Sequence, residues 1–441
     1  MRRLLAALLL LCLATGLNGC SPEPPRPNVL LITLDTTRPD HLSCYGYGRP
    51  TSPALDALAA RGVRFDNAWA GSAETGPSLA TVLTSRRPPA HGVRANAERL
   101  HPDVRTFAEE ATEHGYATGA FVSTVLLKRE HSGFDRGFAH YDDTQTDPCF
   151  GHDNAQRIAE RTIDAARTWI AGTDGPYFAW VHLYDPHGPY LPPTRAQRLD
   201  ATRAGVPNTA LRPGDVPGYQ RVKGVTDSAD YVDRYDHEIA YMDAQLQRLF
   251  ASIDPETTVI AVHADHGEAL GEDGYWFRHG SLLHDPALRI PLILAGPGVP
   301  TFEVDSQRMC TLDIAPTLVG LLGWDGALPD AEGLKWRPAP GRGRPAPVPR
   351  SLIAEARVRE RVRDGTGIDI RWKVRIQDDA ADPVVDAVWW PRADERWPVS
   401  TSEAVIERMK AWLKPPLPLR GGQSVSPSPE LDPALKALGY K

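Results

Sequence analysis

Continuous apolar runs, each about as long as a β-strand, most constrain how this 441-residue chain can fold. They are NVLLITLD (28–35), YATGAFVS (116–123), YFAWVHLY (177–184), TTVIAVHAD (257–265) and IPLILAG (290–296). Runs of this kind are typical of strands that are buried on both faces of a parallel sheet. Patterns of helical length separate or follow them, at 153–172, 230–250 and 311–323. Strands that alternate with helices predict an α/β fold, with a mostly parallel central sheet sandwiched by helices.

The first residues have the pattern of an export signal. Residues 1–19 combine a basic start with an apolar stretch that is too short for a transmembrane helix. The sequence LNGC at 17–20 resembles a bacterial lipobox, so we expect cleavage before Cys20 and a lipid on its thiol. An ordinary signal peptide with an incidental cysteine is the alternative. Ser21 favours sorting to the outer membrane, so we expect an exported protein, lipid-anchored to a bacterial membrane and facing the periplasm or the surface.

Composition changes mark four further regions. Residues 20–27 are Pro-rich and predict a tether, and residues 28–335 contain the strand and helix patterns of the main domain. Residues 336–350 predict a Pro/Gly/Arg linker. Residues 351–441 predict a small C-terminal α+β subdomain and tail, with strands at IRWKVRIQ and DAVWWPR and a helix at SEAVIERMKAWLK.

Charge and cysteine content exclude two classes of function. Loss of residues 1–19, which carry two arginines and no acid, would change the formal charge from −7 to −9. An acidic chain is a poor binder of nucleic acid, so we expect no nucleic-acid partner. Beyond the signal and Cys20, the cysteines are Cys44, Cys149 and Cys310. Three cysteines allow at most one disulfide, and their wide spacing does not match a metal-binding motif.

Acids and a histidine follow two of the apolar runs. Asp35 ends the first run, and Asp265 and His266 end the fourth. Because ligands bind outside the carboxyl ends of strands in an open parallel sheet, we expect these side chains to meet at one edge. Two carboxylates and an imidazole suit Zn²⁺ or Mn²⁺. Asp35 alone could equally be a cap or turn residue. Asp185 and His187 in DPHGP also follow a predicted strand, and this further set of polar residues at a strand end favours a shared site.

The segment ETGPSLATVLTSRRP at 74–88 begins polar and continues as an apolar, helix-like run. Pro77 suits the first helical position. Thr75 would then lie just outside the helix, where free N–H groups favour an anion. It is therefore either an ordinary cap or a nucleophile. A free threonine hydroxyl is a weak nucleophile, so attack would need activation, for example by a metal.

Several longer motifs occur in register along the chain. They are NVLLITLDTTRPDHLSCYGY, TSPALDALAARGVRFDNAWA, GPSLATVLTSRRPPAHGV, HLYDPHGPYLPP, DHGEALGE, RIPLILAGPG and DIAPTLVGLLG. Their order and spacing over about residues 28–325 resemble those of sulfatases of the alkaline phosphatase superfamily. The resemblance implies the fold of that superfamily, a sulfatase-like catalytic domain at 28–335, and a metal-dependent hydrolase or transferase of phosphate or sulfate esters.

The chain departs from the sulfatase pattern at its centre. Sulfatases carry Cys or Ser, converted to formylglycine, at the head of a C/S-x-P-x-R motif, whereas the aligned TGPSL has Thr75 and Leu79. A threonine cannot supply that aldehyde. Thr36 replaces the second acid of the metal motif, and His266 follows Asp265 where many arylsulfatases have Asn. Thr with an Asp-His pair resembles lipoteichoic acid synthases and lipid A phosphoethanolamine transferases, which use Thr on one Mn²⁺ or Zn²⁺ to take a phosphoryl group. Phosphonate monoester hydrolases share the Asp-His pair but keep formylglycine.

The resemblance implies a role for each matching residue. Asp35, Asp265 and His266 would bind one divalent metal together with the Thr75 hydroxyl, with Mn²⁺ or Zn²⁺ favoured over Ca²⁺ or Mg²⁺. Thr75 would also attack phosphorus or sulfur. His187 would contact the non-bridging oxygens or the leaving group.

Other histidines and basic residues have weaker matches. His279 in FRHGSLLHD would bind the anion, and His284 is the alternative if the alignment slips. His182 is expected in the core or behind the metal ligands. The sequence AFVSTVLLKREHSGFDRGFAHYDD replaces the basic GKWH element, and we expect a solvated charged loop there. The alternative is that its basic residues Lys128, Arg129 and His131 partly replace that element.

Three functions remain open. The first is phosphodiester cleavage or phosphoryl transfer through Thr75 with one divalent metal. The second is hydrolysis of sulfuric esters, as in arylsulfatases. The third is a catalytically degenerate lipoprotein that binds anions or glycans. The expected substrate is a small-molecule, lipid or glycan ester, and the expected membrane contact is the lipid at Cys20.

Overall fold

The computed structural model describes residues 26–149, 152–193, 199, 208–280, 283–301, 303–305 and 307–336, and the backbone of three further strands. The predicted export signal, Cys20 and the C-terminal helix at 402–414 lie outside the described residues, so these remain predictions. Within the described part of the chain, no helix has the length and apolar character that a bilayer span requires.

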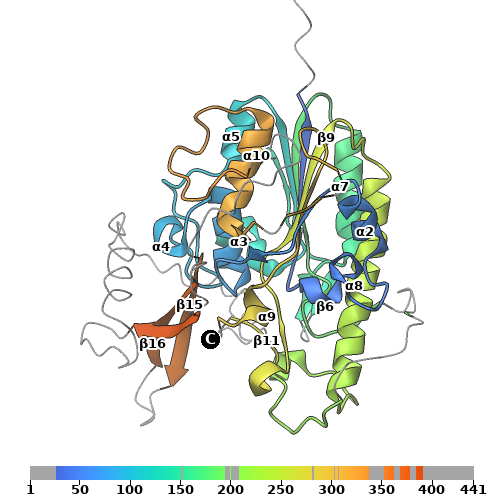
Figure 1. The fold of residues 1–441 in the computed structure, drawn as a ribbon, viewed down its shortest axis with the longest axis vertical. Helices are drawn as coiled ribbons and strands as arrows, with labels where there is room; N and C mark the ends of the chain where they lie inside the picture. The colour runs from blue at the N-terminus through green and yellow to red at the C-terminus, as the bar shows by residue number, and fades with distance from the viewer. Residues whose placement is uncertain are drawn as a thin grey trace, which may run out of the picture.

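A central sheet of eight strands organises the fold (Figure 1). The strand order is β13-β2-β12-β9-β1-β8-β4-β5. The strands are β1 (Asn28–Leu34), β2 (Gly62–Phe65), β4 (Ala117–Phe121), β5 (His140–Asp142), β8 (Tyr177–Leu183), β9 (Thr258–Ala264), β12 (Leu292–Ala295) and β13 (Glu303–Asp305). Only β12 is antiparallel to its neighbours β2 and β9. The other pairs are parallel, which confirms the mostly parallel sheet.

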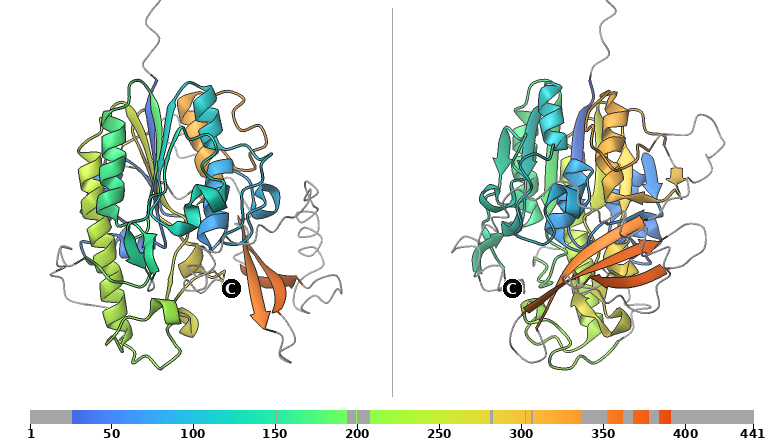
Figure 2. Two further views of the ribbon diagram at one scale, coloured as in Figure 1. Left: turned by 180° about the vertical axis from the view of Figure 1, so that it is seen from behind. Right: turned by 90° about the vertical axis from the view of Figure 1, so that its left-hand side faces the viewer.

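Helices cover both faces of this sheet (Figures 1 and 2). One layer contains α2 (Pro53–Ala59), α7 (Ala159–Ala171) and α8 (Ser228–Phe250), and the other contains α3 (Thr75–Thr84), α5 (Phe107–Glu113) and α10 (Ile314–Leu322). Side chains of β1 alternate between the two cores: Val29 and Leu31 face the α3 layer, and Leu30 faces the α8 layer. A strand that is apolar on both faces must be covered on both, which explains the continuous apolar runs.

Shorter elements connect these layers. The short helices are α4 (Pro88–His91), α6 (Arg129–Ser132) and α9 (Asp285–Leu288), with 3₁₀ turns at Pro39–His41, Ser43–Tyr45, Val125–Leu127, Gly218–Gln220, Glu272–Gly274 and Thr311–Asp313. The short strands are β3 (Ala68–Trp69), β6 (Asp147–Cys149), β7 (His152–Gln156), β10 (Ala269–Leu270), β11 (Trp276–Arg278) and β14 (Met309–Cys310). An antiparallel sheet of β15 (Leu352–Arg361), β16 (Ile368–Gln377) and β17 (Val384–Trp390) confirms the strands expected near the C-terminus.

The helix predicted at 153–172 is shorter than expected. Residues 152–156 form β7, which pairs with β6, and α7 begins only at Ala159. Carboxylates from other segments fix this start, because Asp147 accepts the N–H of Ile158 at 3.1 Å and Asp185 accepts the N–H of Ala159 at 3.0 Å. Distant acids cap this helix, and a local pattern cannot reveal them.

Helix α3 starts two residues earlier than its proline suggested. The carbonyl of Glu74 accepts the N–H of Ser78 at 3.1 Å, so Thr75 is the first helical residue. Pro77 is tolerated in this first turn because an N–H there has no intrahelical partner. Thr75 therefore belongs to the helix, instead of lying outside it.

Candidate active site

Asp35 and Asp265 lie side by side at the carboxyl ends of two neighbouring strands. Strands β1 and β9 are parallel, with Leu34 paired to Ala264, so the next residue of each strand is an aspartate at the same edge. One ligand atom each from Asp35, Asp265 and His266 lies within 4.8 Å of the others. All three side chains are fully buried. We call these three residues the Asp35 cluster.

Thr75 joins this cluster from the first turn of α3. Its Oγ1 lies 3.4 Å from Oδ2 of Asp35 and 3.4 Å from Nε2 of His266. The Ser78 hydroxyl, one turn along, donates to the backbone carbonyl of Asp265 at 2.6 Å. This bond fixes the start of the helix against the end of β9. The structure therefore brings together the four residues expected to bind a metal.

The donor atoms of the Asp35 cluster fit a divalent cation. Oδ1 of Asp35 and Oδ2 of Asp265 are buried and have no hydrogen-bond partner among the described residues. Nδ1 of His266 lies 2.9 Å from the carbonyl of Gly267, so Nδ1 donates and Nε2 is the nitrogen left for a ligand. Buried carboxylate oxygens without donors are costly unless a cation satisfies them. The residues present therefore suit one divalent metal.

The pKa shifts of Asp35 and His266 also favour a bound cation. Burial raises the pKa of Asp35 well above its ordinary value, and the nearby Asp265 carboxylate raises it further. Burial lowers the pKa of His266, but the carboxylates of Asp265 and Asp35 outweigh it and raise that pKa overall. Two buried acids held together repel one another, and a cation between them would relieve that repulsion.

The backbone beside the cluster is strained where the chain departs from the sulfatase pattern. Thr36 has φ of +51°, an uncommon conformation for a β-branched residue. Its N–H donates to Oδ1 of Asp265 at 3.2 Å, and its carbonyl accepts the hydroxyl of Tyr235 at 2.8 Å. The Thr36 hydroxyl is buried, without a hydrogen-bond partner among the described residues. This strain turns the Thr36 N–H toward the Asp265 carboxylate, whose other oxygen faces the cluster.

His187 and His279 also reach this site. The ring of His279 lies 4.5 Å from that of His266, and the ring of His187 lies 5.0 Å from that of His279. Both are buried, and burial lowers the pKa of each well below the ordinary value. His284 lies at the start of α9 with its ring 5.7 Å from that of Tyr275. The geometry therefore favours His279 over His284 as the histidine beside the cluster.

His182 lies behind the cluster, as expected. Its Nε2 is 3.3 Å from Oδ2 of Asp35, and the side chain is fully buried. Burial lowers its pKa to about 4. Thr33 of β1 pairs with both His182 of β8 and His263 of β9, so a polar row crosses the sheet beneath the acids.

The charged loop expected around residues 128–131 is only partly correct: the side chain of Arg129 is 52% exposed, but the segment is helical and buries His131. Residues Arg129–Ser132 form α6, and His131 is only 8% exposed. Arg129 pairs with Asp143, with Nε 3.3 Å from Oδ2. The run of charged residues in the sequence predicts exposure to solvent, whereas packing in the folded chain buries His131.

Sequence reasoning missed two residues at this site. The Oδ1 of Asn96 accepts the N–H of Gly76 at 2.7 Å, and its Nδ2 is buried without a hydrogen-bond partner among the described residues. This bond occupies the N–H of Gly76, one of the free N–H groups expected at the helix start, so that N–H already has a partner within the protein. Glu268 lies next to His279, with Oε1 3.2 Å from Nδ1. The motif DHGE placed Glu268 near His266, but no local pattern singled out Asn96.

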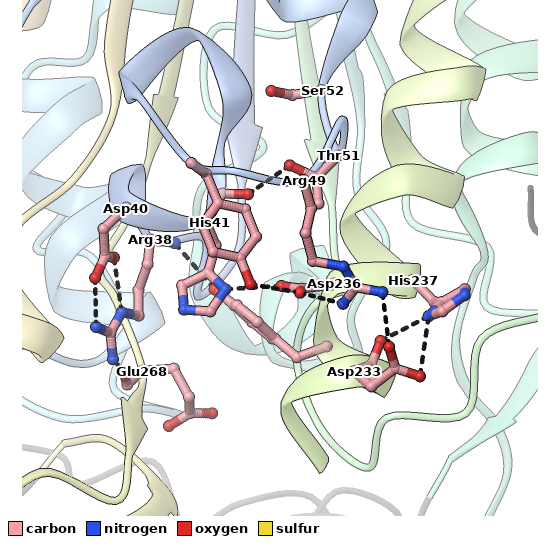
Figure 3. Close-up of polar contacts among 12 residues, drawn as sticks. Arg38, Asp40, His41, Arg49, Thr51, Ser52, Asp233, Asp236, His237 and Glu268 are labelled. Carbon is pink, nitrogen blue, oxygen red and sulfur yellow. Dashed lines mark hydrogen bonds and ion pairs between the residues drawn. The ribbon is translucent and has the colours of Figure 1, made fainter. Parts of the chain in front are cut away.

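A second polar cluster lies close by, against α8 (Figure 3). The Asp236 carboxylate is fully buried, with Oδ1 2.7 Å from Nδ1 of His41 and Oδ2 2.7 Å from the hydroxyl of Tyr47 and 2.6 Å from a guanidinium nitrogen of Arg49. Arg49 also pairs with Asp233 at 2.7 Å. We call these five residues the Asp236 cluster. They hold residues 41–49 against α8, and we assign them a structural role.

Comparisons with known proteins agree with this architecture. A model of the sulfatase family matches residues 27–324. Iduronate 2-sulfatase of Homo sapiens is 29% identical over 334 residues, which cover 62% of this chain and 60% of that protein. Delta 4,5-hexuronate-2-O-sulfatase of Bacteroides thetaiotaomicron is 24% identical and covers 68% of each chain. The chain thus spans about 60% of the length of the human relative.

Solved structures match the fold over most of the chain. The phosphonate monoester hydrolase of Agrobacterium radiobacter superposes with a TM-score of 0.59 at 20% identity, over 88% of this chain and 94% of that one. The fold, the strand-end acids and the family match lead to one conclusion. This chain belongs to the sulfatase family.

Proposed function

We propose that this protein is a metal-dependent ester hydrolase or transferase, with Thr75 as the nucleophile and phosphodiesters as the preferred substrate class. The observation that carries the proposal is the Thr75 hydroxyl, 3.4 Å from both Asp35 and His266. It lies in a buried cluster in which each aspartate has one oxygen without a hydrogen-bond partner among the described residues. A cap residue would bond the backbone of its own helix, but these contacts join Thr75 to the strand ends.

Asp35, Asp265, His266 and the Thr75 hydroxyl would hold one divalent cation. When bound, that ion supplies positive charge that lowers the pKa of the hydroxyl and offsets charge on the ester. The imidazole nitrogen favours Zn²⁺ or Mn²⁺ over Ca²⁺, and Thr36 contributes no second carboxylate beside Asp35.

The residues around Thr75 support an in-line displacement. The Thr75 oxygen would attack phosphorus, and the bond to the leaving oxygen would break with its electron pair on that oxygen. His187 and His279, on the same side of the cluster, would contact the non-bridging or leaving oxygens. The buried Nδ2 of Asn96 would donate to a non-bridging oxygen. Water or an acceptor hydroxyl would then release the group from Thr75.

Phosphoryl chemistry is preferred over sulfuryl chemistry because of the nucleophile. The formylglycine route needs an oxidised Cys or Ser, and position 75 is Thr. Among the similar proteins, iduronate 2-sulfatase is named for a sulfate ester and the phosphonate monoester hydrolase for a phosphorus ester. The two classes share the fold, and Thr75 supports phosphoryl chemistry because it resembles the threonine of the phosphoryl-transferring branch.

A paired assay tests the proposal. Protein loaded with Zn²⁺ or Mn²⁺ is given bis-p-nitrophenyl phosphate and p-nitrophenyl sulfate, and we expect the diester to be cleaved at least about 100-fold faster. Faster cleavage of the sulfate would favour the second candidate, a sulfuric ester hydrolase acting through Thr75. No turnover and no bound metal would favour the degenerate anion-binding or glycan-binding protein.

We also propose that a lipid on Cys20 holds the domain at a bacterial membrane, near lipid or glycan esters. The support is the lipobox-like LNGC followed by a Pro-rich segment. Cys20→Ala should shift the expressed protein from the membrane fraction to the soluble fraction. Membrane association that survives this change would contradict the proposed anchor.

A further inference from the structure

A buried carboxylate lies directly behind His279, and the mechanism above does not use it. Oε1 of Glu268 is 3.2 Å from Nδ1 of His279, and Glu268 is fully buried. His279 in turn lies against the ring of His266, at 4.5 Å between centroids. Glu268 therefore reaches the site through His279.

Three other segments fix the direction of this carboxylate. The hydroxyl of Tyr190 donates to Oε2 at 3.2 Å, and Nε2 of Gln220 donates to the same oxygen at 3.3 Å. A guanidinium nitrogen of Arg38 donates to the Glu268 backbone carbonyl at 3.0 Å. With Oε2 occupied in this way, Oε1 is the oxygen left for His279.

The chain makes room for this arrangement at a glycine. A Cβ on Gly188 would lie 1.3 Å from Oε1 of Gln220, so a side chain there would displace the glutamine. Gly188 directly follows His187 in the DPHGP motif, and Gln220 comes from the 3₁₀ turn before α8. Two loops that flank the site thus meet on Glu268.

We propose that Glu268 is a positioning residue: its hydrogen bond with Nδ1 of His279 holds the ring so that Nε2 is the nitrogen that contacts the ester. The proposal rests on the proposed function, because it assigns His279 a contact with the reacting group. A buried hydrogen bond to one ring nitrogen fixes both the tautomer and the rotation of the ring. Tyr190 and Gln220 hold Glu268, and Glu268 holds His279.

Kinetics test the dependence on His279. Glu268→Ala should lower kcat about 10–100-fold and change KM less than about threefold, because ring orientation matters most in the transition state. Glu268→Gln, which keeps the shape and one acceptor oxygen, should fall between wild type and Glu268→Ala. In a His279→Ala background, Glu268→Ala should cost less than about twofold, because its target is gone. An equal cost in both backgrounds would overturn the proposal.

A spectroscopic arm does not depend on turnover. In the Zn²⁺-loaded protein, one downfield imidazole N–H proton resonance should be present in wild type and in Thr75→Ala. It should be absent in both Glu268→Ala and His279→Ala. If Thr75→Ala stays active but this pattern holds, the proposed nucleophile is wrong and the Glu268–His279 contact is right. If Glu268→Ala keeps the resonance, the contact is wrong whatever the activity.

A matched variant controls for the loss of a buried acid. Glu110 is 4% exposed and belongs to α5, where Leu328 donates its N–H to Oε1 at 3.1 Å. Glu110→Gln should change kcat less than about twofold and leave the imidazole resonance in place. A kcat loss as large as that of Glu268→Gln would indicate a general packing effect and contradict the positioning role.

Discussion

The Asp35 cluster and the carboxylate of Asp236 are both fully buried. Tyr235 connects the two regions: its ring lies 5.2 Å from that of His41, and its hydroxyl donates to the carbonyl of Thr36, whose N–H donates to Asp265. Both oxygens of Asp236 are bonded to donors, one of them an arginine. In the Asp35 cluster, one oxygen of each aspartate has no hydrogen-bond donor among the described residues. The Asp236 carboxylate has its donors within the protein, whereas the Asp35 cluster needs a cation to satisfy its carboxylate oxygens.

This difference distinguishes buried polar residues that hold the fold together from buried polar residues that form a functional site. A buried carboxylate surrounded by donors becomes costly when one partner is removed, whereas a buried carboxylate beside another carboxylate is costly as it stands. Breaking the Asp236 cluster should therefore destabilise the fold. The Asp35 cluster costs stability in the metal-free protein, which is the pattern expected of a site kept for chemistry.

The largest predicted effect is on activity at Thr75. Thr75→Ala should lower turnover of an aryl phosphodiester at least about 10³-fold, because no other hydroxyl replaces the nucleophile. Bound metal should remain measurable, since Asp35, Asp265 and His266 are intact. Thr75→Ser should stay within about tenfold of wild type. Thr84→Ala in the same helix is the control, because the Thr84 hydroxyl donates to the carbonyl of Ala80 and accepts the N–H of Arg86, at the end of the helix opposite Thr75. Turnover by Thr75→Ala equal to this control would contradict the assignment.

The next largest effect is on the stability of the Asp236 cluster. Asp236→Ala should lower the free energy of unfolding by about 3–5 kcal/mol, because it leaves the buried Arg49 with Asp233 alone and removes the partner of His41. Urea unfolding measures this loss. The folded variant should still bind metal. A loss of metal binding with unchanged stability would reverse the roles of the two clusters.

Metal should stabilise the Asp35 cluster specifically. At a free concentration of 100 times Kd, Zn²⁺ or Mn²⁺ should raise the free energy of unfolding by about 3 kcal/mol. Asp35→Asn should abolish this gain and raise the stability of the metal-free protein by about 1 kcal/mol, because it removes a buried charge beside Asp265. A metal-free variant less stable than metal-free wild type would show that Asp35 is structurally required.

His91 offers a third case, a buried polar group that is paired but neutral. Its Nδ1 accepts the N–H of Val93 and its Nε2 lies 3.1 Å from the Thr81 hydroxyl. Burial lowers its pKa to about 3. The unfolded chain binds this proton below pH 6.5 and the folded chain does not, so stability is lost as pH falls through that range. Wild type should lose about 2 kcal/mol more than His91→Gln between pH 8 and pH 5 in urea unfolding; equal losses would contradict this.

Residues whose placement depends on a strand end were predictable from the sequence. Asp35, Asp265 and His266 follow apolar runs, and a parallel sheet brings such ends together, so their meeting follows from pattern alone. Asn96 follows no strand or motif, and only the fold brings it to Gly76. The start of α7 depends on Asp147 and Asp185, which are far from it in sequence or in another element. Contacts between distant segments determine these features, and a local pattern does not carry them.

Metal analysis of the purified protein tests the central claim most directly, that the Asp35 cluster binds one divalent cation beside Thr75. After dialysis against Zn²⁺ or Mn²⁺ and removal of free ion, wild type and Asp236→Ala should each retain about one equivalent per chain, and Asp265→Ala should retain almost none. Wild type without bound metal, or Asp265→Ala with a full equivalent, would contradict the account.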